Sequence, residues 1–153
     1  MKTYKALQIS SWIVKTVDVL GDYEERLSLL KLLKLLYYCE GCSLAEYGQS
    51  LFEEDIVAWE HGPVVVEVYN YYKDDSFNLT YREEDYKIVN QDEQAVQLIQ
   101  SVLNVFGEYS AWGLRNKTHK ETPWLKATDN GRCLKKVISR EEMRKYFKEN
   151  YVE

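Results

Sequence analysis

The apolar run from Leu29 to Leu44 constrains the fold most, because it is helical in length and apolar on nearly every side. Ser28, just before it, is a good N-cap, and Gly48, just after it, is the residue type that most easily takes the left-handed conformation at a helix C-terminus. A helix that is apolar around most of its circumference has to be surrounded by other elements. The sequence therefore predicts a central helix inside a mainly α-helical bundle.

Further helices are predicted where apolar residues recur at helical spacing beside a capping or stop residue. They run from Ala6 to about Gly21, from Pro63 to about Lys73, from Asp92 to Gly107, from Ser110 onward, from Thr122-Pro123 onward, and from Ser139, with Glu142 as its capping-box partner, toward Tyr151. Pro63 and Pro123 are both expected in first helical turns, where proline loses no hydrogen bond.

The stretch from Phe77 to Val89 lacks helical periodicity, and its β-branched and aromatic residues allow two short strands, 78–81 and 86–89. The fold class predicted is therefore mainly α: a compact single-domain bundle around a central apolar helix, with at most a two-stranded hairpin near residues 78–89. The chain length of 153 residues fits one domain, which we expect to span 1–153.

Composition excludes several classes of protein. Hydrophobic residues make up 45% and charged residues 29%, so the chain is expected to fold. No apolar run approaches the roughly 18 residues of a membrane span, and the N-terminus has no signal-peptide core. Three cysteines are too few for a disulfide scaffold. We expect a cytoplasmic protein without a membrane partner.

The net charge of −5 makes nucleic acid an unlikely partner, although the charge is unevenly distributed. Residues 115–148 hold 11 basic and 4 acidic residues. This basic segment is either a solvated helical face or a docking surface for a protein partner.

Neither the cysteines nor the histidines form a convincing reactive site. Cys39 and Cys42 lie inside the predicted central helix without further ligands at zinc-site spacing, so we interpret them as buried residues and expect no metal and no cofactor. His61 and His119 are the only histidines, and neither has a nucleophile and oxyanion donors nearby in a known pattern. With 13 Tyr and 4 Trp, the composition favours a binding role over an enzymatic one.

Three segments resemble the Panacea antitoxin domain family, which contains the SocA-type antitoxins and the phage-associated GepA-like proteins. The first motif segment, 27–38, reads LSLLKLLKLLYY and is similar to the family's L-T-x-x-K-L-x-K-L-L-Y-Y. The second, 58–69, contains AWEHGPV followed by Glu67-Val68-Tyr69 and resembles A-W-x-x-G-P-V-x-x-x-V-Y. The third, 118–124, reads THKETPW and matches T-H-x-E-x-P-W.

The resemblance implies an α-helical antitoxin that neutralises a cognate toxin by direct contact. An alternative is an adaptor that delivers the toxin to a bacterial protease, and a less favoured one is an enzyme using His119 and Glu121. The resemblance names neither the toxin nor the oligomeric state.

We interpret the motif residues as structural and expect partner contacts elsewhere, because one scaffold can serve many partners only if recognition varies while the core does not. The structural set comprises Lys31, Lys34, Tyr37, Tyr38, Trp59, Gly62, Pro63, Tyr69, Thr118, His119, Glu121, Pro123 and Trp124. The candidate partner-binding set comprises Tyr69, Tyr71, Tyr72, Lys135, Lys136, Arg144 and Lys145.

Overall fold

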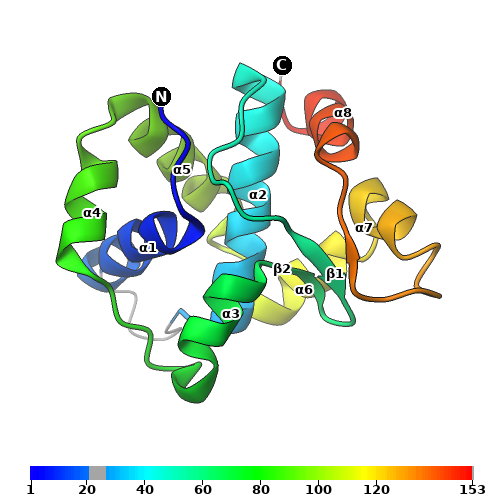
Figure 1. Cartoon of the computed structure of the whole chain (residues 1–153), viewed down its shortest axis with the longest axis horizontal. Coiled ribbons are helices and arrows are strands. Elements are labelled where there is room, and N and C mark those ends of the chain that lie inside the picture. Colours follow the sequence, from blue (N-terminus) through cyan, green and yellow to red (C-terminus); the bar gives the residue numbers. More distant parts are fainter. Residues whose placement is uncertain (21–26, 153) are drawn as a thin grey trace.

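Helix α2 (Leu29–Tyr47) passes through the middle of the molecule (Figure 1). The computed structural model describes residues 1–20 and 27–152. Fourteen of the 19 residues of α2 are buried, so the prediction of a central helix in a mainly α-helical fold is confirmed. Within the described ranges, no helix has the length and apolarity needed to cross a membrane.

The ends of α2 are set by the predicted capping residues. The Ser28 hydroxyl accepts a hydrogen bond from the Lys31 amide at 3.2 Å, which satisfies one of the free donors of the first turn. Gly48 has φ of 65°, the left-handed conformation that stops the helix.

The other helices pack around α2 on both sides. Helices α1 and α4 pack on each other on one side, α7 and α8 on the other, and α2 contacts α1, α3, α5, α6 and α8 (Figure 1). Their bounds are α1 (Ala6–Leu20), α3 (Val66–Tyr72), α4 (Glu83–Asn90), α5 (Glu93–Phe106), α6 (Ala111–Thr118), α7 (Thr122–Ala127) and α8 (Arg140–Asn150), with a 3₁₀ turn (Lys73–Asp75) after α3. The helix end predicted near Gly21 lies outside the described residues.

Side chains cap three of these helices as predicted. Asp92, Ser110 and Ser139 accept hydrogen bonds from backbone amides in the first turns of α5, α6 and α8. The N-cap position of α7 is Glu121, one residue earlier than predicted, and its side chain makes no capping hydrogen bond; Pro123 lies in the first turn.

A small antiparallel sheet lies where no strand was predicted. Its strands are β1 (Val57–Trp59), β2 (Gly62–Val64) and β3 (Lys136–Val137), in the order β2-β1-β3. The placement of Pro63 in a first helical turn is therefore wrong: Pro63 lies in edge strand β2, where its missing N–H is tolerated, and α3 begins at Val66.

The two strands considered near residues 78–89 are not formed. Residues 78–81 have no strand pairing, and 86–89 belong to α4. The acidic first turn, Glu83 to Asp85, stabilises the N-terminus of this helix. Val89 is buried and Tyr86 stacks on Trp12 of α1, so tertiary packing outweighs the local β propensity.

Candidate functional site

The three motif segments meet at the turn between β1 and β2. Backbone carbonyls of the two strands beside this turn accept hydrogen bonds from both other segments. Lys34 Nζ, on α2, donates to the Pro63 carbonyl at 3.1 Å, and Trp124 Nε1, on α7, donates to the Trp59 carbonyl at 3.1 Å. The motif residues thus join the hairpin to the central helix and to the corner between α6 and α7.

His119 completes this junction. One ring nitrogen, Nε2, lies 2.6 Å from the Glu60 carbonyl, and the other, Nδ1, lies 2.6 Å from the Arg115 carbonyl. Carbonyl oxygens only accept, so a neutral ring can donate to one of them and a protonated ring to both. The ring also packs against Trp124, with 4.1 Å between ring centroids. Both nitrogens are therefore occupied by the backbone.

Glu121 has a buried carboxylate that binds two tyrosines. Tyr37 of α2 donates to Oε1 at 3.0 Å, and Tyr151, after α8, donates to Oε2. Burial raises the pKa of the Glu121 carboxyl, while the hydrogen bonds from Tyr151 and Tyr37 oppose that rise. This carboxylate ties α7 to α2 and to the C-terminal end of α8.

The other motif residues also make contacts that hold neighbouring elements in place. Lys31 Nζ donates to the Gly107 carbonyl at the end of α5 at 2.6 Å. The Thr118 hydroxyl donates to the Arg115 carbonyl one turn earlier at 2.8 Å. Pro123 is buried in the first turn of α7, and the ring of Tyr38 stacks on Phe106 of α5 with 3.9 Å between centroids.

Gly62 allows the hairpin to approach α2 closely. Its φ is 109°, which L-residues with a side chain rarely adopt. A Cβ there would lie 2.6 Å from Lys34 Cε and 2.9 Å from Thr118 Oγ1.

Replacing Gly62 by alanine is expected to lower the free energy of unfolding by about 2 kcal/mol, through backbone strain and these close contacts. Gly48→Ala is the matched control, because Gly48 also has a positive φ but has nothing within 4 Å of the added Cβ. Its expected cost is about 1 kcal/mol. Urea unfolding of both variants measures the difference, and equal costs would contradict the role given to the Lys34 and Thr118 contacts.

The Lys34 amine is fully buried in this junction. Burial, together with the nearby Arg115, lowers the pKa of the Lys34 amine from 10.5 to about 7. Arg115 Nε is itself buried and has no hydrogen-bond partner among the described residues. Neither basic group forms an ion pair within residues 1–20 and 27–152.

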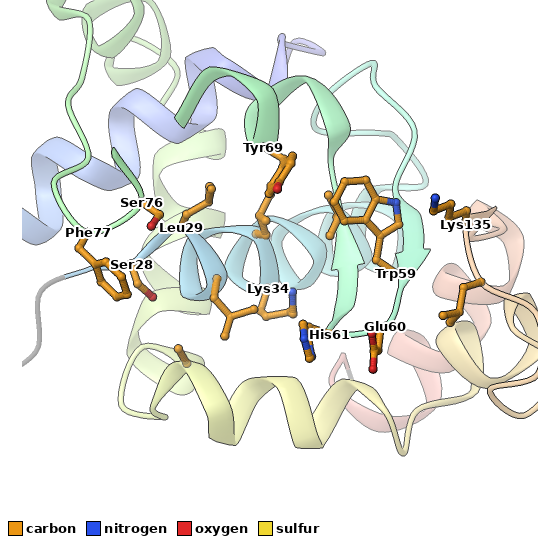
Figure 2. Close-up of a pocket in the computed structure, with 15 residues that line it drawn as sticks. Ser28, Leu29, Lys34, Trp59, Glu60, His61, Tyr69, Ser76, Phe77 and Lys135 are labelled. Carbon is orange, nitrogen blue, oxygen red and sulfur yellow. The ribbon is translucent and has the colours of Figure 1, made fainter. Parts of the chain in front are cut away.

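A pocket of about 560 Å³ adjoins Lys34 (Figure 2). It lies between the N-terminal half of α2, the β1–β2 hairpin, α3 and the start of α6, within the size range of ligand-binding pockets. Most of its lining is apolar or aromatic. The lining residues are Ser28, Leu29, Leu30, Leu33, Lys34, Trp59, Glu60, His61, Val64, Tyr69, Ser76, Phe77, Ala111, Leu134 and Lys135.

The candidate partner-binding residues are distributed over three places. Tyr69 and Lys135 line the pocket, and Tyr69 packs edge-to-face on Trp59. Tyr71 is exposed. Tyr72 is buried and donates its hydroxyl hydrogen to the Thr80 carbonyl, so its side chain is not available at the surface for a partner. Lys136 lies on β3, Lys145 is exposed on α8, and Arg144 pairs with Glu141 of α8.

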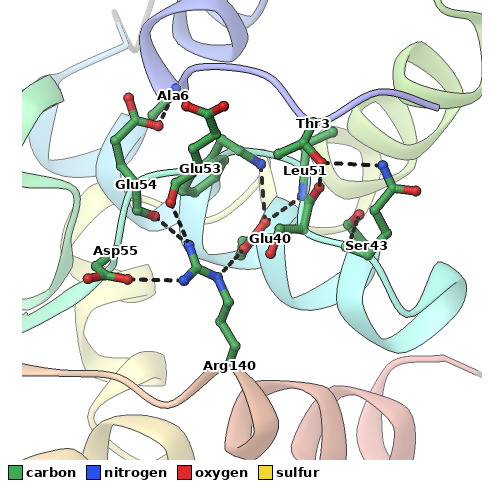
Figure 3. Close-up of polar contacts among 12 residues, drawn as sticks. Thr3, Ala6, Glu40, Ser43, Leu51, Glu53, Glu54, Asp55 and Arg140 are labelled. Atoms are coloured by element: carbon green, nitrogen blue, oxygen red, sulfur yellow. Dashed lines mark hydrogen bonds and ion pairs between the residues drawn. The ribbon is translucent and has the colours of Figure 1, made fainter.

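Sequence reasoning missed a second polar cluster, around Glu40 in the C-terminal half of α2 (Figure 3). Glu40 is fully buried and accepts hydrogen bonds from the Leu51 amide at 2.7 Å and from Arg140 Nε at 3.1 Å. Arg140 also binds Asp55 and the carbonyls of Glu53 and Glu54. Burial raises the pKa of the Glu40 carboxyl, and Arg140 opposes the rise. A lone acidic residue within the apolar run was the available signal.

The cysteines of the central helix are buried thiols. Burial raises the pKa of Cys39 well above its usual value and that of Cys42 to about 12, so both are protonated. Among the described residues, no group of three or more His, Cys, Asp and Glu side chains is arranged to hold a metal ion.

The sequence model described as "Antitoxin SocA-like, Panacea domain" matches residues 32–125, more than half of the chain. The chain belongs to this antitoxin family. The matched region contains most of the three motif segments and the hairpin turn where they meet. No curated protein matches the chain significantly. No solved structure does so either. The Panacea domain thus places this protein with toxin–antitoxin and phage-associated systems.

Proposed function

We propose that this Panacea protein is an antitoxin that neutralises its cognate toxin by direct binding, with residues 1–153 acting as one domain. The observation that carries the proposal is the family match together with the way the motif side chains are used. Their polar groups bind backbone carbonyls and each other, and so they hold the fold together.

The same contacts disfavour an enzyme based on His119 and Glu121. A general acid or base needs a free nitrogen or carboxylate oxygen within reach of a substrate. Both His119 nitrogens face backbone carbonyls, and the Glu121 carboxylate accepts from Tyr37 and Tyr151. Glu121 is buried, and the His119 ring lies against Trp124.

The basic C-terminal segment supports a role in partner association. Lys135 is exposed in the loop before β3, Lys136 on β3 and Lys145 on α8, whereas Arg144 is partly neutralised by Glu141. Exposed charges of this kind mainly accelerate encounter with an acidic partner, and anchoring requires apolar contacts.

The test is an activity assay with the product of the neighbouring gene, purified separately. Stoichiometric antitoxin is expected to inhibit the toxin fully in a mixture that contains no protease. Inhibition seen only in cells that contain a protease would favour the adaptor function instead. His119→Ala is the control, and its inhibition of the toxin should fall only in proportion to the loss of folded protein. A fully folded His119→Ala variant that binds the toxin normally but does not inhibit it would favour the enzyme.

A further inference from the structure

The pocket beside Lys34 has an apolar floor. Leu29, Leu30 and Leu33 of α2 line it, together with Tyr69 of α3 and Ala111 of α6. Leu29 and Tyr69 are labelled in Figure 2. The pocket therefore adjoins the apolar central helix, and its floor includes core side chains.

The rim of the pocket is also apolar and exposed. Phe77 is 71% exposed and Leu134 is 42% exposed, and both line the pocket. Trp112, 54% exposed, lies next to the pocket residue His61 with 5.8 Å between ring centroids. A small molecule that fills the pocket leaves these rim side chains in water, whereas a protein segment covers the floor and the rim together.

The charges beneath the pocket define the chemistry of that segment. Lys34 donates to one carbonyl, although an ammonium has three N–H groups, and Arg115 Nε donates to none of the described groups. Neither has a carboxylate partner in the described part of the chain. Two adjacent basic groups without an acidic partner in an apolar site are complementary to a carboxylate, which favours the protonated form of the amine.

We propose that this pocket is the anchor site for the toxin and that it receives an apolar toxin segment bearing an aspartate or glutamate, whose carboxylate pairs with Lys34. The inference rests on the proposed antitoxin function. In the free protein the Lys34 side chain is fully buried, so the flexible end of the lysine rotates toward the pocket when the carboxylate arrives. The anchor lies at the junction of the three motif segments, and the rim residues Phe77, Trp112 and Leu134, which lie outside those segments, are left to discriminate between toxins.

The first experiment measures binding kinetics of full-length variants to the purified product of the neighbouring gene. Phe77→Ala and Leu134→Ala, both at exposed positions, are each expected to speed dissociation about tenfold. Ile88→Ala is the matched control: Ile88 is 44% exposed on α4 and does not line the pocket. Its dissociation rate should stay within about twofold of wild type.

The second experiment tests the carboxylate by a double-mutant cycle. Each toxin Asp and Glu is changed to Asn or Gln and is combined with Lys34→Met, whose folding is checked by circular dichroism. One toxin change and Lys34→Met are each expected to weaken binding about tenfold or more, and the pair together should weaken it little further.

The outcomes separate this inference from the proposed function. A wild-type chain that does not bind the toxin would overturn both. A wild-type chain that binds, with rim variants that dissociate as slowly as wild type, would overturn the anchor site alone. Additive effects for every toxin carboxylate combined with Lys34→Met would overturn the ion pair.

Discussion

Replacing Lys34 by methionine is expected to stabilise the protein, raising the free energy of unfolding by about 3 kcal/mol near pH 7. The buried amine has a pKa of about 7, against 10.5 for an ordinary lysine. Each unit of such a difference corresponds to about 1.4 kcal/mol of stability. Loss of the hydrogen bond to the Pro63 carbonyl, about 1 kcal/mol, offsets part of the gain.

The effect should depend on pH with a defined sign. Between pH 7 and 10.5 the unfolded chain binds a proton at Lys34 that the folded chain does not hold, so wild-type stability rises with pH across this window. The variant lacks this contribution, and its advantage should therefore shrink from pH 7 toward pH 9. Urea unfolding of both proteins at several pH values measures the difference in their free energy of unfolding. The tyrosines and cysteines are present in both proteins, so their contributions cancel in this difference.

Lys31→Met provides the control on the same helix. Lys31 Nζ donates to the Gly107 carbonyl at the end of α5, so its loss should destabilise the protein by about 1 kcal/mol. If Lys34→Met destabilises the protein as much as Lys31→Met does, the claim that burial of the Lys34 amine costs stability is wrong. A stabilised variant with weakened toxin binding would instead indicate that Lys34 is retained for recognition at a cost in stability.

The central helix and most of its neighbours could be predicted because local signals determine them. The apolar run between Ser28 and Gly48 specifies a buried helix without knowledge of its partners. The same holds for the caps at Asp92, Ser110 and Ser139. These features depend on residues three or four positions apart, which a sequence displays directly.

The hairpin and α4 could not be predicted because long-range contacts determine them. Strand β1 pairs with β3, about 80 positions later in the chain. The positive φ of Gly62 allows the hairpin backbone to lie close to the Lys34 and Thr118 side chains. Helix α4 contains Ile88 and Val89, which favour strands locally, yet it packs on α1.

The candidate site also combines features that local sequence reveals with features that depend on long-range contacts. The motif residues were identifiable from the resemblance, but their shared location was not a property of any one segment. The pocket combines residues from Ser28 to Lys135, and its exposed rim residue Phe77 belongs to no motif. Tyr71 and Tyr72 were assigned together to the partner-binding set, whereas helix geometry directs Tyr72 inward and Tyr71 outward.

Replacing Arg140 by methionine is expected to destabilise the protein by about 3 kcal/mol, because it leaves the fully buried Glu40 carboxylate without its charged partner. The amides of Leu51 and Phe52 still donate to Glu40, which limits the loss, but Arg140 also holds Asp55 and two carbonyls of the 53–55 segment.

The cost should be larger at pH 8 than at pH 5. Burial raises the pKa of Glu40, and loss of Arg140 removes a group that lowers it, so the folded variant holds a proton that the unfolded chain releases above pH 4.5. Stability then falls as pH rises through this window. Glu40→Gln combined with Arg140→Met should recover part of the loss at pH 8, since a neutral amide oxygen still accepts from Leu51. A loss independent of pH and unrelieved by Glu40→Gln would show that Arg140 acts through its contacts with the 53–55 segment and not through the charge of Glu40.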